Sequence, residues 1–213
     1  MNKFFIYIVF VSALVLTSCK NDIENLSISK SKVTDYYESG AYETELKEAL
    51  KPAYEELNKS SAKKGDAIVF DVDETILSNY AYIKSIDFGY NRQLWDKYLL
   101  NINADPIEQT VKFYKAALEK NYSIIFLTAR THDSYEHTLE NLRTRGIEVF
   151  DTLICRTREL EDAPASEFKQ DERKLLTESG YNIFMCVGDQ DSDLLGDNTG
   201  IKIKLPNKLY LTK

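Results

Sequence analysis

Histidine, cysteine and long hydrophobic runs are scarce in this chain of 213 residues. Its two histidines, His132 and His137, flank an expected helix start. No third ligand is apparent beside them, so we expect exposed side chains rather than a zinc site. One apolar run covers thirteen residues, 4–16, interrupted by Ser12. At 1.5 Å per residue it is too short for about 30 Å of hydrocarbon, which disfavours a retained transmembrane helix.

The chain also lacks an excess of basic residues. It has 27 Lys and Arg against 34 Asp and Glu; without residues 1–18, which contain Lys3 and no acid, the count is 26 against 34, a net charge of −8. This balance argues against nucleic acid or anionic lipid as the main partner. It would also repel phosphorylated substrates, so any phosphate site has to be locally positive.

The first residues have the organisation of a secretory signal. Lys3 precedes the apolar run and Leu16-Thr17-Ser18-Cys19 follows it, so that small residues come before a cleavage point. These four residues resemble the lipobox of bacterial lipoproteins; the alternative is an incidental cysteine beside an ordinary signal. The resemblance implies a signal peptide over 1–18, a lipid on Cys19 and anchorage in the cell envelope, at an outer-membrane, periplasmic or surface face. We expect a flexible tether over 19–34 and one folded domain over 35–213.

Strands and helices are expected to alternate along this domain. Pro52 should break or kink the first helix, and Asp133 should form a capping box with Glu136. The alternation predicts an α/β fold with a parallel sheet, helices on both faces and an N-terminal helical extension. The expected strands are 67–70, 123–127, 149–155, 183–187 and 201–205, and the expected helices are 36–58, one from 106, one from 133, and 167–179.

Acidic residues directly follow the first expected strand. Period-2 alternation points Asp71 and Asp73 to the same side, where two carboxylates repel unless a cation lies between them. The alternative is a helix cap or turn, a common role of short acidic pairs. Thr128, Asp189 and Asp193 follow other strands of the sheet. All five fall at the carboxyl edge, where parallel sheets bind ligands, and this shared placement favours a site.

These residue types can perform phosphoryl transfer. Asp71 can attack phosphorus, while Asp73 can protonate the leaving alkoxide and later deprotonate water. Asp71, Asp189 and the backbone carbonyl of Asp73 can bind Mg²⁺, which prefers oxygen ligands. The hydroxyl of Thr128 and the ammonium of Lys169, in the first turn of its expected helix, can hold the phosphoryl oxygens.

Four segments together resemble the haloacid-dehalogenase-like phosphatases. The similarity is to the acid phosphatase branch, which includes bacterial lipoprotein acid phosphatases and plant vegetative storage proteins (class B and C types). It implies Mg²⁺-dependent hydrolysis of small phosphomonoesters, nucleotides among them, through an aspartyl-phosphate. It also implies a Rossmann-like sheet in the strand order five-four-one-two-three. The segments, in the family's order, are 69–79 (VFDVDETILSN), 126–130 (FLTAR), 168–173 (FKQDER) and 187–195 (VGDQDSDLL).

The resemblance has consequences for single residues. In that strand order Cys155 lies three strands from Cys186, roughly 14 Å at about 4.8 Å per strand, whereas a disulfide needs Cα atoms within about 7 Å. We therefore expect free thiols. The family's Lys, followed four residues later by Arg, fits Lys169 and Arg173, which leaves the competing Lys174 at the surface.

Some residues keep two interpretations. Asp189 is a metal ligand or a turn residue, and Asp193 completes the acidic cluster or caps the next turn. Arg130 pairs with a carboxylate or touches substrate. Asp191 stands where plant members tend to carry an aromatic residue, and we expect it to be solvated.

The aromatic-rich insert after the first strand, residues 76–104, is also open to two interpretations. Aromatic residues usually belong to a core. In this segment, Tyr80, Tyr82 and Trp95 are instead candidates for a wall over the pocket that stacks on a nucleobase or nicotinamide ring.

The sequence thus predicts a lipid-anchored, Mg²⁺-dependent acid phosphatase whose partners are a small phosphomonoester and the membrane. The alternative is a catalytically weak binding or storage-like protein on the same scaffold. The residues that argue against it are Asp71, Asp73, Thr128, Lys169 and Asp189. Dehalogenation is disfavoured by Asp73, because cleavage of a carbon–halogen bond needs no acid.

Overall fold

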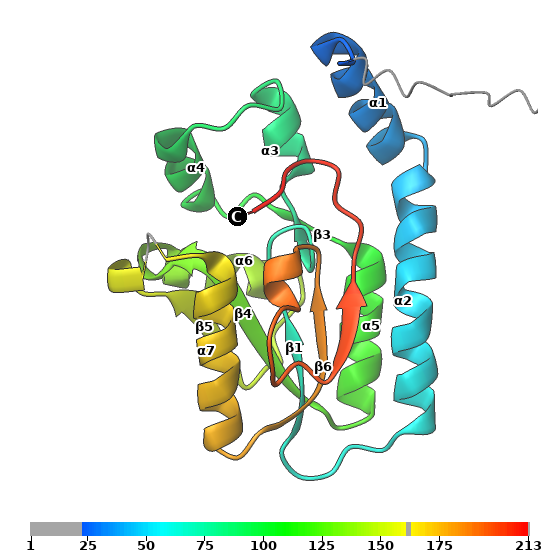
Figure 1. Ribbon diagram of the computed structural model, residues 1–213, viewed down its shortest axis with the longest axis vertical. Coiled ribbons are helices and arrows are strands. Elements are labelled where there is room, and N and C mark those ends of the chain that lie inside the picture. The colour runs from blue at the N-terminus through cyan, green and yellow to red at the C-terminus, as the bar shows by residue number, and fades with distance from the viewer. Residues whose placement is uncertain (1–22, 161–162, 213) are drawn as a thin grey trace, which may run out of the picture.

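A five-stranded parallel sheet lies at the centre of the computed structural model, which describes residues 23–160 and 163–212 (Figure 1). The strands have the order β5-β4-β1-β6-β7, which is the predicted order read from the other end, and each neighbouring pair is parallel. The predicted fold class and strand order are therefore confirmed. The strands are β1 (Asp66–Phe70), β4 (Ser123–Thr131), β5 (Thr152–Arg156), β6 (Asn182–Gly188) and β7 (Ile201–Lys204).

Helices cover both faces of the sheet, as predicted. Side chains of α2, α5 and α6 pack in a larger core on one face, and α7 packs in a smaller core on the other. Figure 1 shows α7 on the opposite side of the strands from α2 and α5. These helices are α2 (Ala41–Lys59), α5 (Glu108–Glu119), α6 (Tyr135–Thr144) and α7 (Ala165–Glu178).

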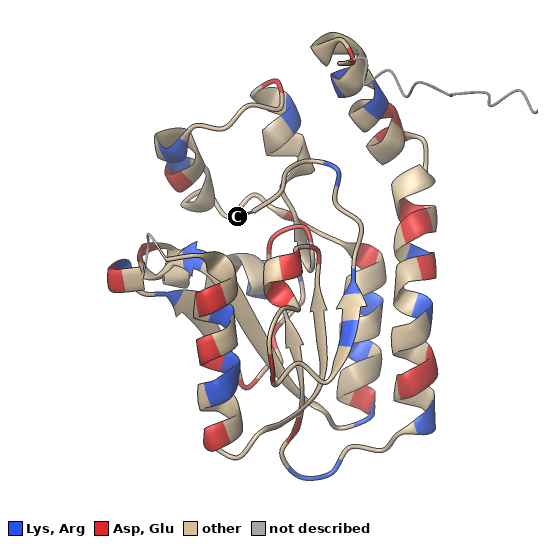
Figure 2. Ribbon diagram, in the orientation of Figure 1, with Lys and Arg blue, Asp and Glu red and all other residues tan. Residues whose placement is uncertain are grey.

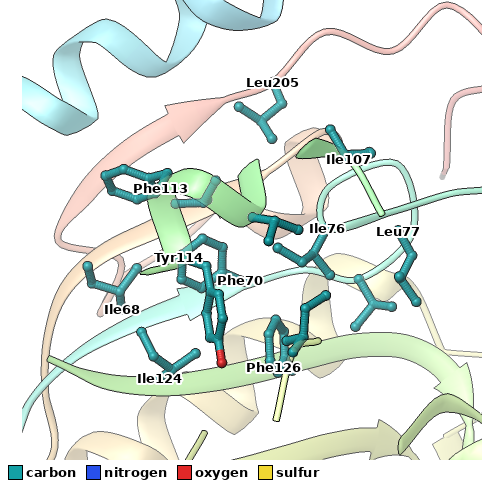
Figure 3. Close-up of a cluster of buried hydrophobic side chains, with 14 of the residues drawn as sticks. Ile68, Phe70, Ile76, Leu77, Ile107, Phe113, Tyr114, Ile124, Phe126 and Leu205 are labelled. Atoms are coloured by element: carbon teal, nitrogen blue, oxygen red, sulfur yellow. The ribbon is translucent and has the colours of Figure 1, made fainter. Parts of the chain in front are cut away.

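The central strand β1 contributes to both cores because successive side chains in a strand point to opposite faces. Ile68 and Phe70 join the larger core, where Figure 3 shows Phe70 near Phe113 and Phe126. Val69 joins the smaller core beside α7. The next residue of the same parity is Asp71, so the alternation that buries Val69 also directs Asp71 toward α7.

The N-terminal extension differs from its prediction. Helix α1 (Leu26–Glu38) occupies part of the expected tether, and Gly40, with φ of 87°, separates it from α2. A left-handed residue ends a helix readily when it is glycine. Pro52 causes no break: it lies inside α2 on its exposed side, where the carbonyl left without a helical partner can bind water.

The aromatic insert forms a small lobe above the carboxyl edge of the sheet (Figure 1). We call residues 77–106 the cap. At its base β2 (Leu77–Ser78) pairs antiparallel with β3 (Asp105–Pro106), and between them lie α3 (Tyr80–Ser85) and α4 (Arg92–Leu99). The lobe covers the edge where the predicted site residues lie.

The capping box predicted at Asp133 is wrong. A 3-10 turn, η1 (His132–Ser134), precedes α6 and moves Asp133 out of the N-cap position. Its carboxylate instead accepts hydrogen bonds of 2.7 and 3.1 Å from Arg158. Two further 3-10 turns are η2 (Arg158–Leu160) and η3 (Asp191–Asp193).

The two cysteines in the described part of the chain are free, as predicted. Cys155 lies in the larger core and Cys186 in the smaller one, so the sheet separates them. Burial raises the pKa of both thiols to about 12, which keeps them neutral at pH 7.

Within residues 23–160 and 163–212, no helix combines the length and apolar character needed to cross a bilayer. The expected signal peptide over 1–18 and the lipidation site Cys19 lie outside the described residues.

Candidate active site

Charged residues gather at the carboxyl edge of the sheet beneath the cap (Figure 2). Asp71 and Asp73 follow β1, Arg130 lies near the end of β4, and Asp189 follows β6. Between this edge and the cap lies a cavity of about 530 Å³. Its charged wall contains Asp71, Asp73, Arg130, Lys169, Asp189 and Asp193.

Lys169 lies at the centre of these charges. Because α7 begins at Ala165, Lys169 occupies its second turn and not the predicted first. The preceding Phe168 packs in the smaller core, and Lys169 is only 3% exposed. Its Nζ lies 2.5 Å from Oδ1 of Asp71 and 2.5 Å from Oδ1 of Asp193. One buried ammonium therefore joins acids that follow two different strands.

Burial and charge repulsion raise several pKa values in this site. Burial raises the pKa of Asp71, although Lys169 opposes the shift. Burial, followed by the charge of Asp193, raises the pKa of Asp189 to about 7, and burial with the charge of Asp73 raises that of Glu74 to about 7. Burial lowers the pKa of Lys169, but Asp193 and Asp71 raise it overall. The site thus holds more carboxylate charge than its own cations balance.

Three buried carboxylates can hold a metal ion. One oxygen each of Asp71, Asp189 and Asp193 lies within 4.8 Å of the other two. Such oxygen donors suit a hard divalent cation such as Mg²⁺, and the excess negative charge favours one. The residues present therefore fit the metal. The carboxylate of Asp73 is not part of this cluster; its predicted backbone ligation stays a prediction.

Asp73 is held by Arg130. Nη2 and Nε of Arg130 donate hydrogen bonds of 2.6 and 3.0 Å to Asp73, and Nδ2 of Asn79 donates one of 2.7 Å. Of the two interpretations of Arg130, the structure confirms the one in which it pairs with a carboxylate. Asp73 keeps part of its surface in the cavity wall. Its carboxylate is therefore both oriented and accessible, as an acid/base group must be.

Thr128 and Arg173 bond to the backbone. Thr128 is fully buried, and its Oγ1 accepts a hydrogen bond of 3.2 Å from the N–H of Arg130. Its contact with phosphate stays a prediction. Arg173 donates to the carbonyls of Asp193, at 3.0 Å, and Leu195. Its predicted supporting role therefore consists of fixing the loop that carries Asp193.

The structure confirms that Asp193 caps the turn, and its carboxylate also lies in the acidic cluster, while contact with a metal's waters stays a prediction. Its Oδ2 accepts a hydrogen bond of 2.8 Å from the N–H of Gln190 as part of a capping box, while Oδ1 meets Lys169. Asp191 and Lys174 are exposed, as predicted. His132 is exposed too, but His137 is partly buried, because it borders the buried face of α6.

The aromatic wall is correct in part. Tyr82 and Trp95 line the cavity, and Tyr82 stacks on Tyr98 with ring centroids 4.1 Å apart. Tyr80 does not belong to this wall: its ring stacks on Tyr37 of α1 at 4.7 Å, and its hydroxyl donates to Glu38. The side chain points from the cap toward the N-terminal extension, which the sequence pattern did not indicate.

Sequence reasoning missed Glu74, Asn207 and Tyr210. Glu74 is 2% exposed with φ of 54°, a left-handed conformation that costs energy outside glycine and is concentrated at functional sites. Its carboxylate accepts the N–H of Asn79 at 2.6 Å and the hydroxyl of Tyr210. Asn207 donates to Asp189. Glu74 could have been found in the sequence, because it directly follows Asp73 in the first acidic motif. Asn207 and Tyr210 lie in a segment that contains no such motif.

Comparisons with known proteins agree with this geometry. The model of the HAD superfamily, subfamily IIIB (Acid phosphatase), matches residues 9–213. The chain is 34% identical over 182 residues to Stem 28 kDa glycoprotein of Glycine max, covering 83% of this chain and 72% of the relative. It is 30% identical over 189 residues to Vegetative storage protein 1 of Arabidopsis thaliana, covering 85% of this chain and 69% of the relative.

The fold is similar to that of a class C acid phosphatase from Bacillus anthracis solved with tungstate bound, with a TM-score of 0.68, 19% identity and 86% of each chain covered. The match to the family model includes every segment that forms the carboxyl-edge site. This chain therefore belongs to the haloacid dehalogenase superfamily, subfamily IIIB, the acid phosphatases, and is a phosphomonoester hydrolase.

Proposed function

We propose that this acid phosphatase depends on Mg²⁺ and forms an aspartyl-phosphate on Asp71. One observation carries the proposal. The site gathers the carboxylates of Asp71, Asp73, Glu74, Asp189 and Asp193 around two basic side chains. A phosphate dianion added to this excess of negative charge would be repelled, so a bound divalent cation is needed for the substrate to enter.

The protein's own residues divide the reaction between them. A carboxylate oxygen of Asp71 attacks phosphorus, and the new bond between this oxygen and phosphorus forms as the ester P–O bond breaks. Asp73, oriented by Arg130, gives the leaving oxygen a proton. It then takes a proton from a water molecule, whose oxygen bonds to phosphorus as the bond from phosphorus to Asp71 breaks, so that phosphate leaves and the carboxylate of Asp71 is restored. Lys169 and Thr128 would hold phosphoryl oxygens. The metal, bound by Asp71, Asp189 and Asp193, would supply charge stabilisation.

The substrate class is inferred from the cap. Tyr82 and Trp95 in the cavity wall offer flat apolar surfaces opposite the acidic edge. These features support nucleotides among the phosphomonoesters, with the base against the cap and the phosphate at Asp71.

The location is inferred from the sequence alone. The arrangement of Lys3, the apolar run and Leu16-Thr17-Ser18-Cys19 supports export and a lipid on Cys19. A phosphatase held in the envelope in this way would release phosphate from external esters and leave the dephosphorylated product for uptake.

A second candidate function is a binding or storage protein with little catalysis. The identity to Vegetative storage protein 1 favours it as an alternative. The nucleophile, the buried lysine and the acidic cluster of this chain support catalysis instead.

The first test is phosphate release from a panel of phosphomonoesters by the purified protein, with Mg²⁺ and with chelator. We expect release that needs Mg²⁺ and that Asp71→Asn abolishes while its thermal unfolding stays cooperative, because the amide is not a nucleophile. Asp191→Asn is the matched control, since that carboxylate is exposed in the same acidic loop, and it should keep wild-type activity. No release from any ester by the folded, Mg²⁺-supplied protein would favour the storage alternative.

The role of Asp73 is tested with two leaving groups. Asp73→Asn should lower kcat by about 10²–10⁴ for an alkyl phosphate, whose leaving oxygen needs a proton, and less for p-nitrophenyl phosphate, whose leaving group needs none. Steady-state rates on both esters measure the difference, with exposed Asp105→Asn as control. An equal loss on both esters would remove Asp73 from the acid role.

Stacking on the cap is tested by Trp95→Ala. Loss of one base–aromatic contact should lower kcat/KM for nucleoside monophosphates about tenfold and leave that for glycerol phosphate unchanged. The aliphatic ester serves as internal control for damage to the cap. If both substrates lose equally, or neither loses, the aromatic wall does not recognise the base.

Anchorage is tested by Cys19→Ser in a bacterial cell that exports the chain. Without a thiol to carry lipid, the protein should move from the membrane fraction to the soluble fraction, with Cys155→Ser as control. Retention of Cys19→Ser in the membrane would show that another segment holds the protein there.

A further inference from the structure

The segment that follows β7, residues 207–212, crosses the candidate active site. We call it the tail segment; Figure 1 shows it running from β7 toward the cap. Asn207 donates to Asp189, Tyr210 donates to Glu74, and the N–H of Thr212 donates to Oε1 of Gln190 at 3.0 Å. None of these three residues belongs to a motif that the sequence analysis identified.

The carboxylate of Asp189 is bound on both oxygens. Oδ1 accepts a hydrogen bond of 3.1 Å from the hydroxyl of Thr75. Oδ2 accepts one of 2.5 Å from Gln190 and one of 2.7 Å from Asn207. Asp189 is 2% exposed, so these protein groups replace the water that would otherwise surround it. Its orientation therefore depends on donors from three separate parts of the chain.

The amide of Asn207 can present only its nitrogen to Asp189. Its Oδ1 accepts the backbone N–H of Leu209 at 2.7 Å, a turn typical of asparagine, so the NH₂ group must face the carboxylate. The backbone beside it is anchored separately, because the N–H of Lys208 donates to the hydroxyl of Tyr37 at 3.2 Å. The donor to Asp189 is thus held from both sides.

We propose that Asn207 is a positioning residue for the metal ligand Asp189, so that the tail segment sets the Mg²⁺ affinity of the active site. The inference rests on the proposed Mg²⁺ dependence. Groups that hydrogen-bond to a metal ligand fix the orientation of that ligand. Their loss typically weakens metal affinity by about 10- to 100-fold.

The test compares Asn207→Ser with Lys208→Ser. A serine at 207 can still accept the N–H of Leu209 but is too short to reach Asp189, so the turn is kept and the donor is lost. Lys208 is the matched control, because its side chain faces Glu45, at 3.6 Å, and the ring of Tyr36, away from the site. Isothermal titration with Mg²⁺ alone measures the Kd, and thermal unfolding in chelator measures the metal-free fold.

We expect Asn207→Ser to raise the Mg²⁺ Kd about tenfold or more, and Lys208→Ser to leave it unchanged. The Mg²⁺ concentration for half-maximal phosphate release should rise in parallel, with little change in kcat at saturating metal. A Kd for Asn207→Ser within twofold of wild type would overturn the inference and leave the proposed phosphatase function intact. This holds even if the unfolding temperature in chelator falls, because a purely structural role of Asn207 changes that temperature and not the Kd. Wild-type protein that binds no Mg²⁺ would overturn both.

Discussion

The buried ammonium of Lys169, shared between Asp71 and Asp193, is the interaction on which the site depends. Moving an ion out of water costs several kcal/mol, which close opposite charges must offset. Phe168 and Leu176 of α7 pack against the sheet and so fix the position of Lys169. The smaller core therefore determines where the positive charge lies, and the acids of two loops converge on it.

The cap contacts the N-terminal extension as well as the body of the domain, where Leu77 and Ala104 join the larger core. Tyr80 of α3 stacks on Tyr37 of α1, Glu38 bonds to α3, and Lys30 pairs with Asp87. Exposed ion pairs such as the last contribute little, so the buried aromatic contact is the main connection.

The sequence was sufficient for the parts of the site that follow local rules. Alternation along β1 placed Asp71 on the side of α7, and the parallel order brought Asp189 to the same edge. It was insufficient where a contact joins distant segments. In the sequence, Tyr80 looks like the other aromatic residues of the cap, and only the position of α1 shows that it packs against Tyr37 instead. Asn207 follows the edge strand β7 in a segment that contains no recognisable motif. The break predicted at Pro52 is wrong, because α2 continues through this residue, while a kink there stays a prediction.

The charge of the site argues for a further cation beyond Lys169 and Arg130. An ammonium has three donors, and Asp71 and Asp193 already take two of them. One donor remains for a phosphoryl oxygen, and Arg130 is occupied by Asp73 and Thr138. Two cations that already serve acids cannot neutralise a phosphate dianion as well. The hydrogen-bond partners of Asp189 are the neutral groups of Asn207, Gln190 and Thr75, so none of them offsets its negative charge. Burial and the charge of Asp193 raise its pKa to about 7, and a bound metal ion would supply the cation that these partners lack.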